Sequence, residues 1–150
     1  MAIDFKKQGK TNRKKGVRFE HKVRDILKDK YVVIKWDKNV EFPDENLMLP
    51  PEERIGKLIQ AKKAFNPFTK RLGYGNGFPD FCFYAVNETE LIKGFNGCEV
   101  KTAKYLKPIE TDKCAWLLEQ KIFRKIYIAY NTKNGIRFKN FATNEDEEIC

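Results

Sequence analysis

The chain of 150 residues is 41% hydrophobic and 34% charged, a balance that indicates one folded domain (1–150) and excludes a wholly disordered chain. Lysine and arginine total 30 against 21 acidic residues, and this basic surplus favours nucleic acid as a partner because bound phosphates release counterions. No apolar run is long enough to span a membrane and no secretory signal is present, so we expect a cytoplasmic protein without a membrane partner.

The first part of the chain predicts a helix followed by a strand. Residues 1–13 are polar and basic, which favours a flexible arm, and residues 14–28 have helical periodicity. The apolar positions of this helix are Phe19, Val23, Ile26 and Leu27. Glu20 borders their stripe, where a carboxylate is unusual and needs a partner. One alternative is a surface pair with Arg24, one turn later. Residues 31–37 then predict a strand.

Residues 43–77 are of mixed character and predict an insertion. Pro50 favours the start of a short helix that runs to Ala64. The apolar face of that helix would carry Ile55, Leu58 and Ile59. Basic and aromatic residues accompany a glycine-rich loop at 73–77: Phe65, Phe68, Lys70, Arg71 and Tyr74. This mixture suits a nucleic-acid groove, and a plain flexible connection is the alternative.

The second half predicts two strands, a helix and a final strand. The strands cover residues 81–87 and 91–102, the helix runs from Pro108 to about residue 123, and the last strand covers residues 125–130. The apolar helix positions are Ala115, Leu118 and Ile122. The acidic end, residues 142–150, predicts a disordered tail. A helix between the third and fourth strands favours a parallel crossover, so the fold is α/β with a mixed central sheet flanked by helices.

Two carboxylates and a lysine fall on the two central strands. Asp80 stands where the first of these strands begins, and Glu99 and Lys101 lie two residues apart on the second. Side chains at this spacing point to the same face, while Cys98 and Val100 point into a core. Such a cluster is costly unless a divalent cation and a phosphate bind there. The alternative is a solvated hairpin edge with ordinary charges.

The histidine and cysteine residues of the sequence do not indicate a catalytic or metal-binding site. His21 is the only histidine, which argues against histidine-dependent nuclease chemistry and histidine-rich zinc sites. The four cysteines lack metal-ligand spacing. Cys82 and Cys98 could lie on neighbouring strands, which leaves a disulfide open.

In these residues the chain resembles the PD-(D/E)XK nuclease superfamily, which shares a restriction-endonuclease-like αβββαβ core. The matching positions are Glu20, Pro79-Asp80 and Glu99-Val100-Lys101. The nearest in look are archaeal Holliday junction resolvases and VRR-NUC nucleases. Leu106-Lys107-Pro108-Ile109-Glu110 is similar to the Leu-x-Pro-x-Gln element of the latter, with glutamate for glutamine. The loop at 73–78 lacks the serine of many resolvases.

The resemblance implies a catalytic set of Glu20, Asp80, Glu99 and Lys101. It implies Mg²⁺ or Mn²⁺ on Asp80, Glu99 and the Val100 carbonyl, with Glu20 serving a second metal or orienting a metal-bound water. No organic cofactor is expected.

The implied function is a metal-dependent DNA endonuclease that acts on branched DNA as a homodimer. One alternative is a nuclease of linear duplex DNA or its ends, and another is a non-catalytic nucleic-acid-binding protein of the same fold. The basic residues expected to contact DNA are Lys14, Lys15, Arg18, Lys70, Arg71 and Lys104.

Overall fold

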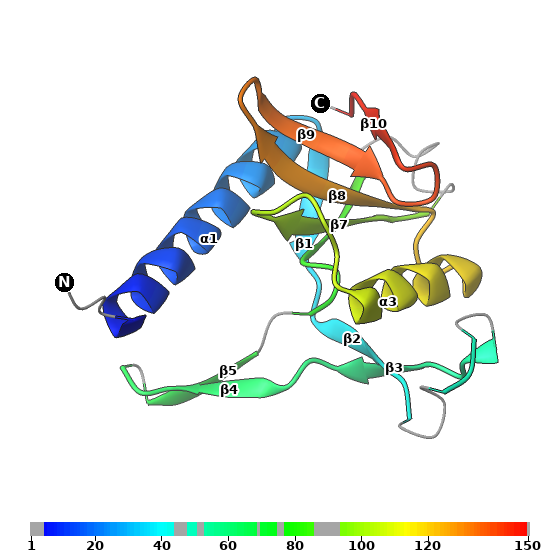
Figure 1. Cartoon of the computed structure of the whole chain (residues 1–150), viewed down its shortest axis with the longest axis horizontal. Helices are drawn as coiled ribbons and strands as arrows, with labels where there is room; N and C mark the ends of the chain where they lie inside the picture. The colour runs from blue at the N-terminus through cyan, green and yellow to red at the C-terminus, as the bar shows by residue number, and fades with distance from the viewer. Residues whose placement is uncertain are drawn as a thin grey trace.

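The computed structural model describes residues 5–43, 48–50, 53–68, 70–74, 77–85 and 94–149. Within them the chain forms a mixed six-stranded sheet, with one helix against each face (Figure 1). The helices are α1 (Phe5–Lys28) and α3 (Pro108–Glu119). In spatial order the sheet contains β1 (Tyr31–Lys35), β6 (Phe81–Ala85), β7 (Asn96–Lys101), β8 (Lys125–Thr132), β9 (Gly135–Asn140) and β10 (Glu145–Glu147).

Strand directions follow the predicted pattern. β6 is antiparallel to both of its neighbours, β1 and β7, and β7 and β8 are parallel. α3 connects that parallel pair, as a crossover requires. The prediction of a mixed α/β sheet flanked by helices is therefore confirmed.

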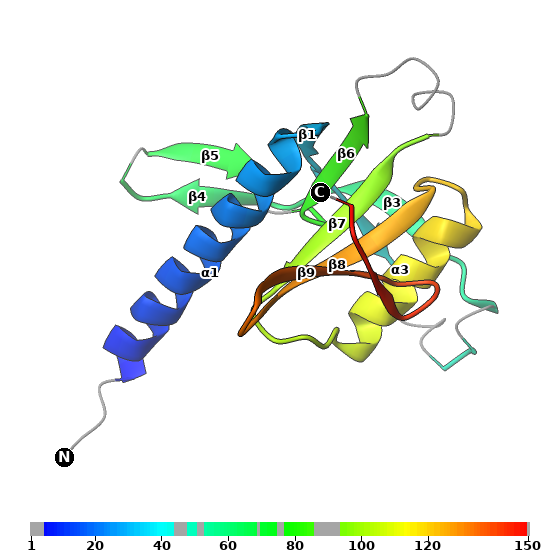
Figure 2. The same ribbon diagram turned by 90° about the horizontal axis from the view of Figure 1, so that it is seen from above.

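The two sheet faces bury separate cores, which we call the α1-side core and the α3-side core. The α1-side core contains Phe19, Val23, Leu27, Phe81, Phe83, Cys98, Tyr127, Ala129 and Phe138. The α3-side core contains Val40, Phe42, Phe78, Cys82, Cys114, Leu117, Phe123, Ile126 and Ile128. Successive residues of β8 enter opposite cores, because successive side chains of a strand point to opposite faces. Figure 2 shows α1 and α3 on opposite sides of the sheet.

Both helices differ from their predicted bounds. α1 begins at Phe5 rather than at residue 14, so the described part of the expected flexible arm, residues 5–13, is helical. That segment contains no proline and several good helix formers, which allows the helix to extend. α3 begins at Pro108 as predicted but ends at Glu119, and Lys121 then takes a positive φ of 58°. Its buried residues are Cys114 and Leu117, whereas Ala115 is exposed.

The insertion contains strands where a helix was predicted. β2 (Lys38–Glu41) pairs with β3 (Lys57–Gln60), and β4 (Lys63–Asn66) pairs with β5 (Arg71–Tyr74). The predicted helical face is wrong, since Ile55 is exposed and the next two apolar residues lie on β3. β2 and β3 lie beneath α3, and β4 and β5 extend toward the side on which α1 begins (Figures 1 and 2).

The predicted disordered tail is also corrected. Residues 145–147 form β10, which pairs with β9. Glu147 accepts hydrogen bonds from Lys125 at 3.4 Å and from Asn140 at 2.6 Å, and Asp146 accepts one from the Tyr130 hydroxyl at 2.7 Å. The acidic residues of the tail thus pair with side chains of β8 and β9.

Three further expectations concern the central strands, the cysteines and a membrane span. The central strands β6 and β7 are confirmed, but residues 86–93, which both predictions included in part, lie outside the described residues. Cys82 and Cys98 enter different cores and form no disulfide. Neither helix of the described chain has the length and apolar character needed to cross a bilayer.

A close backbone approach requires glycine at position 77. A Cβ there would lie 2.2 Å from the Trp36 carbonyl oxygen and 2.6 Å from that of Lys38. We expect Gly77→Ala to lower the free energy of unfolding by about 1–3 kcal/mol, as overpacking does. Gly16→Ala, on α1 with no atom within 4 Å, is the control and should raise it by about 0.5–1 kcal/mol. Urea denaturation measures both, and a Gly77→Ala variant as stable as wild type would contradict the packing argument.

Candidate active site

Two carboxylates face each other across β6 and β7. Asp80 directly precedes β6, whose register pairs Phe81 with Cys98 and so sets Asp80 opposite Glu99. The Asp80 N–H donates to Glu99 Oε2 at 3.1 Å, and the Val100 N–H donates to Asp80 Oδ2 at 2.8 Å. Each carboxylate is therefore held by the main chain of the other strand. The site is prearranged by strand pairing.

The segment before β6 is fixed by close packing. The Trp36 N–H donates to the Asp80 carbonyl at 3.2 Å. Pro79 packs where Gly97 has no side chain, since a Cβ at Gly97 would lie 2.8 Å from Pro79 Cγ. Gly97 thus gives Pro79 the space that brings Asp80 next to Glu99.

Both carboxyl groups resist ionisation. Burial is the main cause that raises the pKa of Glu99 to about 9, and the charge of Asp80 adds to it. Burial likewise raises the pKa of Asp80 to about 6, where the Val100 N–H opposes the shift and the Glu20 carboxylate contributes to it. Two such groups are stabilised as anions when a cation lies between them.

Lys101 shares the face of Glu99, as predicted, and joins it to α3. Its Nζ lies 3.6 Å from Glu99 Oε1 and donates to Glu110 Oε2. Burial favours the neutral amine, but the bond to Glu110 and the two carboxylate charges outweigh it and raise the pKa of Lys101. Lys101 is therefore an ammonium, which can donate to a phosphate oxygen but cannot accept a proton.

Glu110 is a site residue that the sequence reasoning missed as such. It is the third residue of α3 and accepts the Lys107 N–H at 2.9 Å, which caps the helix. Burial acts to raise the pKa of Glu110, but the bonds from Lys101 and Lys107 lower it below its ordinary value. The proline that opens the helix was the signal, because it places Glu110 at the capping position next to the strand that carries Lys101.

Glu20 approaches the pair from the other face of the sheet. It lies on α1 beside Phe19 and Val23, which are buried in the α1-side core, and it is half-buried. Its charge acts on Asp80 closely enough to raise the pKa of that group. Arg24 makes its ion pair with Asp25, at 3.8 Å. Glu20 is thus half-buried at the border of the apolar stripe, where the helical wheel places it, and its part in the site stays a prediction.

The donor set suits a hard divalent cation that keeps bound waters. Asp80 and Glu99 present carboxylate oxygens on one face, and Val100 lies next to Glu99 with a main-chain carbonyl. Within the described ranges no three side chains of the ligating types form a compact metal cluster. Mg²⁺ characteristically takes one or two carboxylates and fills its other positions with water or phosphate oxygens, so these residues fit it.

A basic groove lies next to Lys101, at the end of β7. It has a volume of about 310 Å³ and is lined by Lys15, Arg18, Phe19, Lys22, Thr102 and Asn131. Two of the expected DNA-binding residues, Lys15 and Arg18, therefore share one groove. Lys22 was missed, although it follows them at positions i+7 and i+4 on the same helical face.

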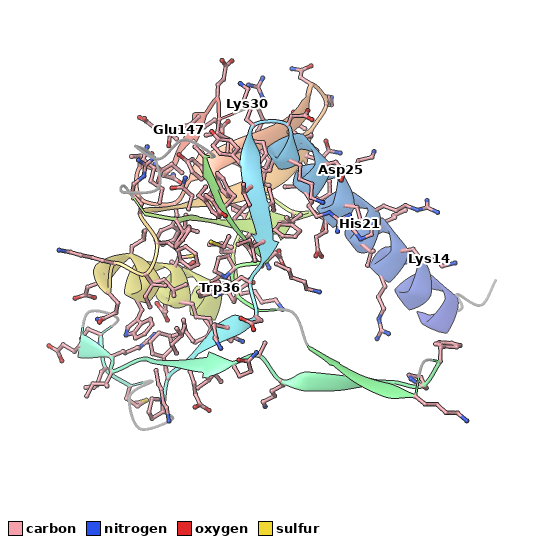
Figure 3. The ribbon with its side chains drawn as sticks, turned by 180° about the vertical axis from the view of Figure 1, so that it is seen from behind. Lys14, His21, Asp25, Lys30, Trp36 and Glu147 are labelled. Carbon is pink, nitrogen blue, oxygen red and sulfur yellow. The ribbon has the colours of Figure 1, made fainter. Side chains whose placement is uncertain are left out.

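The other expected DNA-binding residues are more scattered. Lys14 is exposed on the same helix, near the end where α1 begins (Figure 3). Lys104 is exposed and its Nζ lies 5.3 Å from the centre of the Tyr130 ring. Lys70 is exposed just before β5, and the side chain of Arg71 lies outside the described residues. His21 is exposed on α1.

Comparisons of the chain with protein-family models, curated proteins and solved structures gave no match.

The raised carboxyl pKa values predict a pH-dependent stability without metal. The folded state binds protons more tightly than the unfolded chain, in which the ordinary values are 3.8 for Asp80 and 4.5 for Glu99. This contribution is complete below about pH 4 and is lost as the pH rises through the folded values, about 6 and about 9. We expect urea denaturation in EDTA to show the loss, and added Mg²⁺ to reverse it.

Glu99→Gln should reduce this loss because it removes the larger contribution. Glu119→Gln, at an exposed position of α3, should leave it unchanged. An equal fall in wild type and Glu99→Gln would show that other groups cause it.

Proposed function

We propose that this protein is a metal-dependent nuclease that hydrolyses the phosphodiester bonds of DNA, as a member of the PD-(D/E)XK superfamily. The observation that carries the proposal is the pair of half-buried Asp80 and buried Glu99, with Lys101 on the same sheet face and the charge of Glu20, on α1, acting on Asp80. These four residues come from three separate parts of the chain. An ordinary charged surface gives no reason for charged residues from three segments to gather in one place.

The order of elements supports the same assignment. The chain runs α1, β1, β6, β7, α3 and β8, with antiparallel pairing among the first three of these strands and a parallel pair at the end. With β2 to β5 left out, this order agrees with the αβββαβ order that the resemblance implies. On this proposal β2 to β5 are an insertion, and β9 and β10 extend the sheet.

Asp80, Glu99 and the Val100 carbonyl would hold Mg²⁺ or Mn²⁺. When bound, the cation lowers the pKa of a coordinated water and offsets charge on the phosphate. Lys101, as an ammonium fixed by Glu99 and Glu110, stabilises the negative charge that develops on the phosphate oxygens. Glu20 would serve a second cation or orient a water next to Asp80.

DNA would enter along the basic groove beside β7. Lys15, Arg18 and Lys22 line it together with the uncharged side chains of Thr102 and Asn131. Contacts of this kind bind the phosphate backbone without reading sequence. A structure-selective enzyme for branched DNA needs such contacts, and two symmetric cuts would need a homodimer.

A cleavage assay tests this function. The assay offers four DNA substrates: a four-way junction, a flap, a linear duplex and a single strand. With Mg²⁺ or Mn²⁺ we expect wild type to cut the branched substrates. EDTA should abolish cleavage. Asp80→Ala and Glu99→Ala should each lower kcat/KM by about a hundredfold or more, because bound metal supplies several kcal/mol.

Glu119→Ala is the matched control, since it removes an exposed carboxylate from α3. Cutting of linear duplex alone would favour the alternative substrate. Binding of DNA with no cleavage of any substrate would favour a non-catalytic protein, and full activity in EDTA would refute the metal-dependent mechanism.

Glu20→Gln tests the role of α1 in the site. The substitution keeps size and removes charge, so we expect kcat to fall about 10–100-fold with little change in the melting temperature. Asp25→Asn, on the same helix with a side chain that is 70% exposed, should alter neither (Figure 3). Equal activity of Glu20→Gln and Asp25→Asn would remove Glu20 from the site.

A further inference from the structure

A second lysine lies near the carboxylates, and within the described ranges it has no ion-pair partner. Lys113 follows Glu110 by one helical turn on α3 and is half-buried. Its Nζ donates to Asn39 Oδ1 at 3.0 Å and lies 5.5 Å from the centre of the Phe78 ring. Phe78 stands two residues before Asp80, so the ammonium lies next to the segment that leads into Asp80.

The groups that hold Lys113 are neutral and are themselves fixed. Asn39 Oδ1 also accepts the N–H of Val40 at 2.8 Å, which sets the direction of the amide oxygen. Asn39 lies on β2, whose pairing with β3 holds it in place, and Phe78 is buried. Lys113 is therefore positioned without a charge that would neutralise it.

The charges that act on Lys113 belong to acidic residues of the candidate active site. Burial lowers the pKa of Lys113, and the carboxylate charges of Glu110 and Glu99 oppose this shift from beyond ion-pair distance. Among the described residues no acid pairs with Lys113 directly. Lys101 differs, because it contacts both of those carboxylates. A half-buried ammonium is stabilised by a compensating anion, and none of the described residues provides one in contact with Lys113.

We propose that Lys113 is an anion-binding residue that takes a phosphate group of the DNA backbone beside the Asp80–Glu99 pair. The inference rests on the proposed nuclease function. A phosphate oxygen can accept a charge-assisted hydrogen bond from Nζ, while Asn39 and Phe78 keep the ammonium in place. This contact would position the substrate on the α3 side of the sheet, opposite the groove on α1.

A purely structural role is the competing explanation, in which Lys113 only fastens β2 to α3 through Asn39. The two roles predict different variants. If Lys113 binds phosphate, the charge matters and arginine should substitute for it. If Lys113 is only a fastener, Asn39→Ala should reproduce the effect of Lys113→Met.

The test is binding of the dinucleotide d(TpT) and of inorganic phosphate to the full chain in EDTA, followed by NMR of the lysine side chains. We expect d(TpT) to shift the Lys113 resonance. Lys113→Met should weaken d(TpT) binding about 10–100-fold, as loss of a hydrogen bond to a charged group does. Lys113→Arg and Asn39→Ala should stay within a few fold of wild type, and Lys133→Ala, at an exposed turn, should not change it.

Each contrary result overturns the inference. These results are equal binding by Lys113→Met and Lys133→Ala, equal loss in Asn39→Ala and Lys113→Met, or binding of inorganic phosphate with exclusion of d(TpT). Melting temperatures identify any variant that has lost its fold. In that case the d(TpT) affinity of Lys113→Arg and the shift of the Lys113 resonance in wild type decide.

Cleavage assays separate this inference from the proposed function. Wild type that binds d(TpT) through Lys113 but cuts no DNA would refute the nuclease and leave the phosphate site. Active wild type with unchanged kcat/KM and unchanged d(TpT) affinity in Lys113→Met would refute the phosphate site and leave the nuclease.

Discussion

The pairing of β6 with β7 is the constraint on which the site depends. It sets Asp80 opposite Glu99 and lets the main chain of each strand donate to the carboxylate of the other. A shift of one residue would turn Glu99 to the opposite face, since side chains alternate along a strand. The glycine at position 97, which makes room for Pro79, preserves the register at the same point.

Ion pairs connect this pair of carboxylates to the start of α3. Lys101 lies between Glu99 and Glu110, and Glu110 in turn caps α3, so the helix is oriented by the site as well as by its apolar side. Burial raises the pKa of both carboxyl groups, and the charge of Asp80 raises that of Glu99 further. Such an arrangement sacrifices stability for the binding of a ligand, which is common at functional sites.

The sequence predicted those features of the site that depend on residues close together in the chain. The alternation of side chains placed Glu99 and Lys101 together, and the helical wheel brought Glu20 inward. The insertion escaped prediction because Pro50 and the acids after it are typical of a helix start, whereas β3 is held by β2, from an earlier part of the chain. The tail escaped for a similar reason: its acids pair with Lys125, Tyr130 and Asn140, which no local pattern indicates. Glu110 and Lys113 needed the position of α3 against the sheet.

The strand β10 has a consequence for self-association. It covers β9 and ends the sheet with a short acidic strand, Glu145–Glu147. A second copy approaching this edge would bring like charges together, and short charged edge strands resist edge-to-edge pairing. A continuous sheet running through two copies at β10 is therefore disfavoured, and a two-fold assembly of this chain would have to form through another surface.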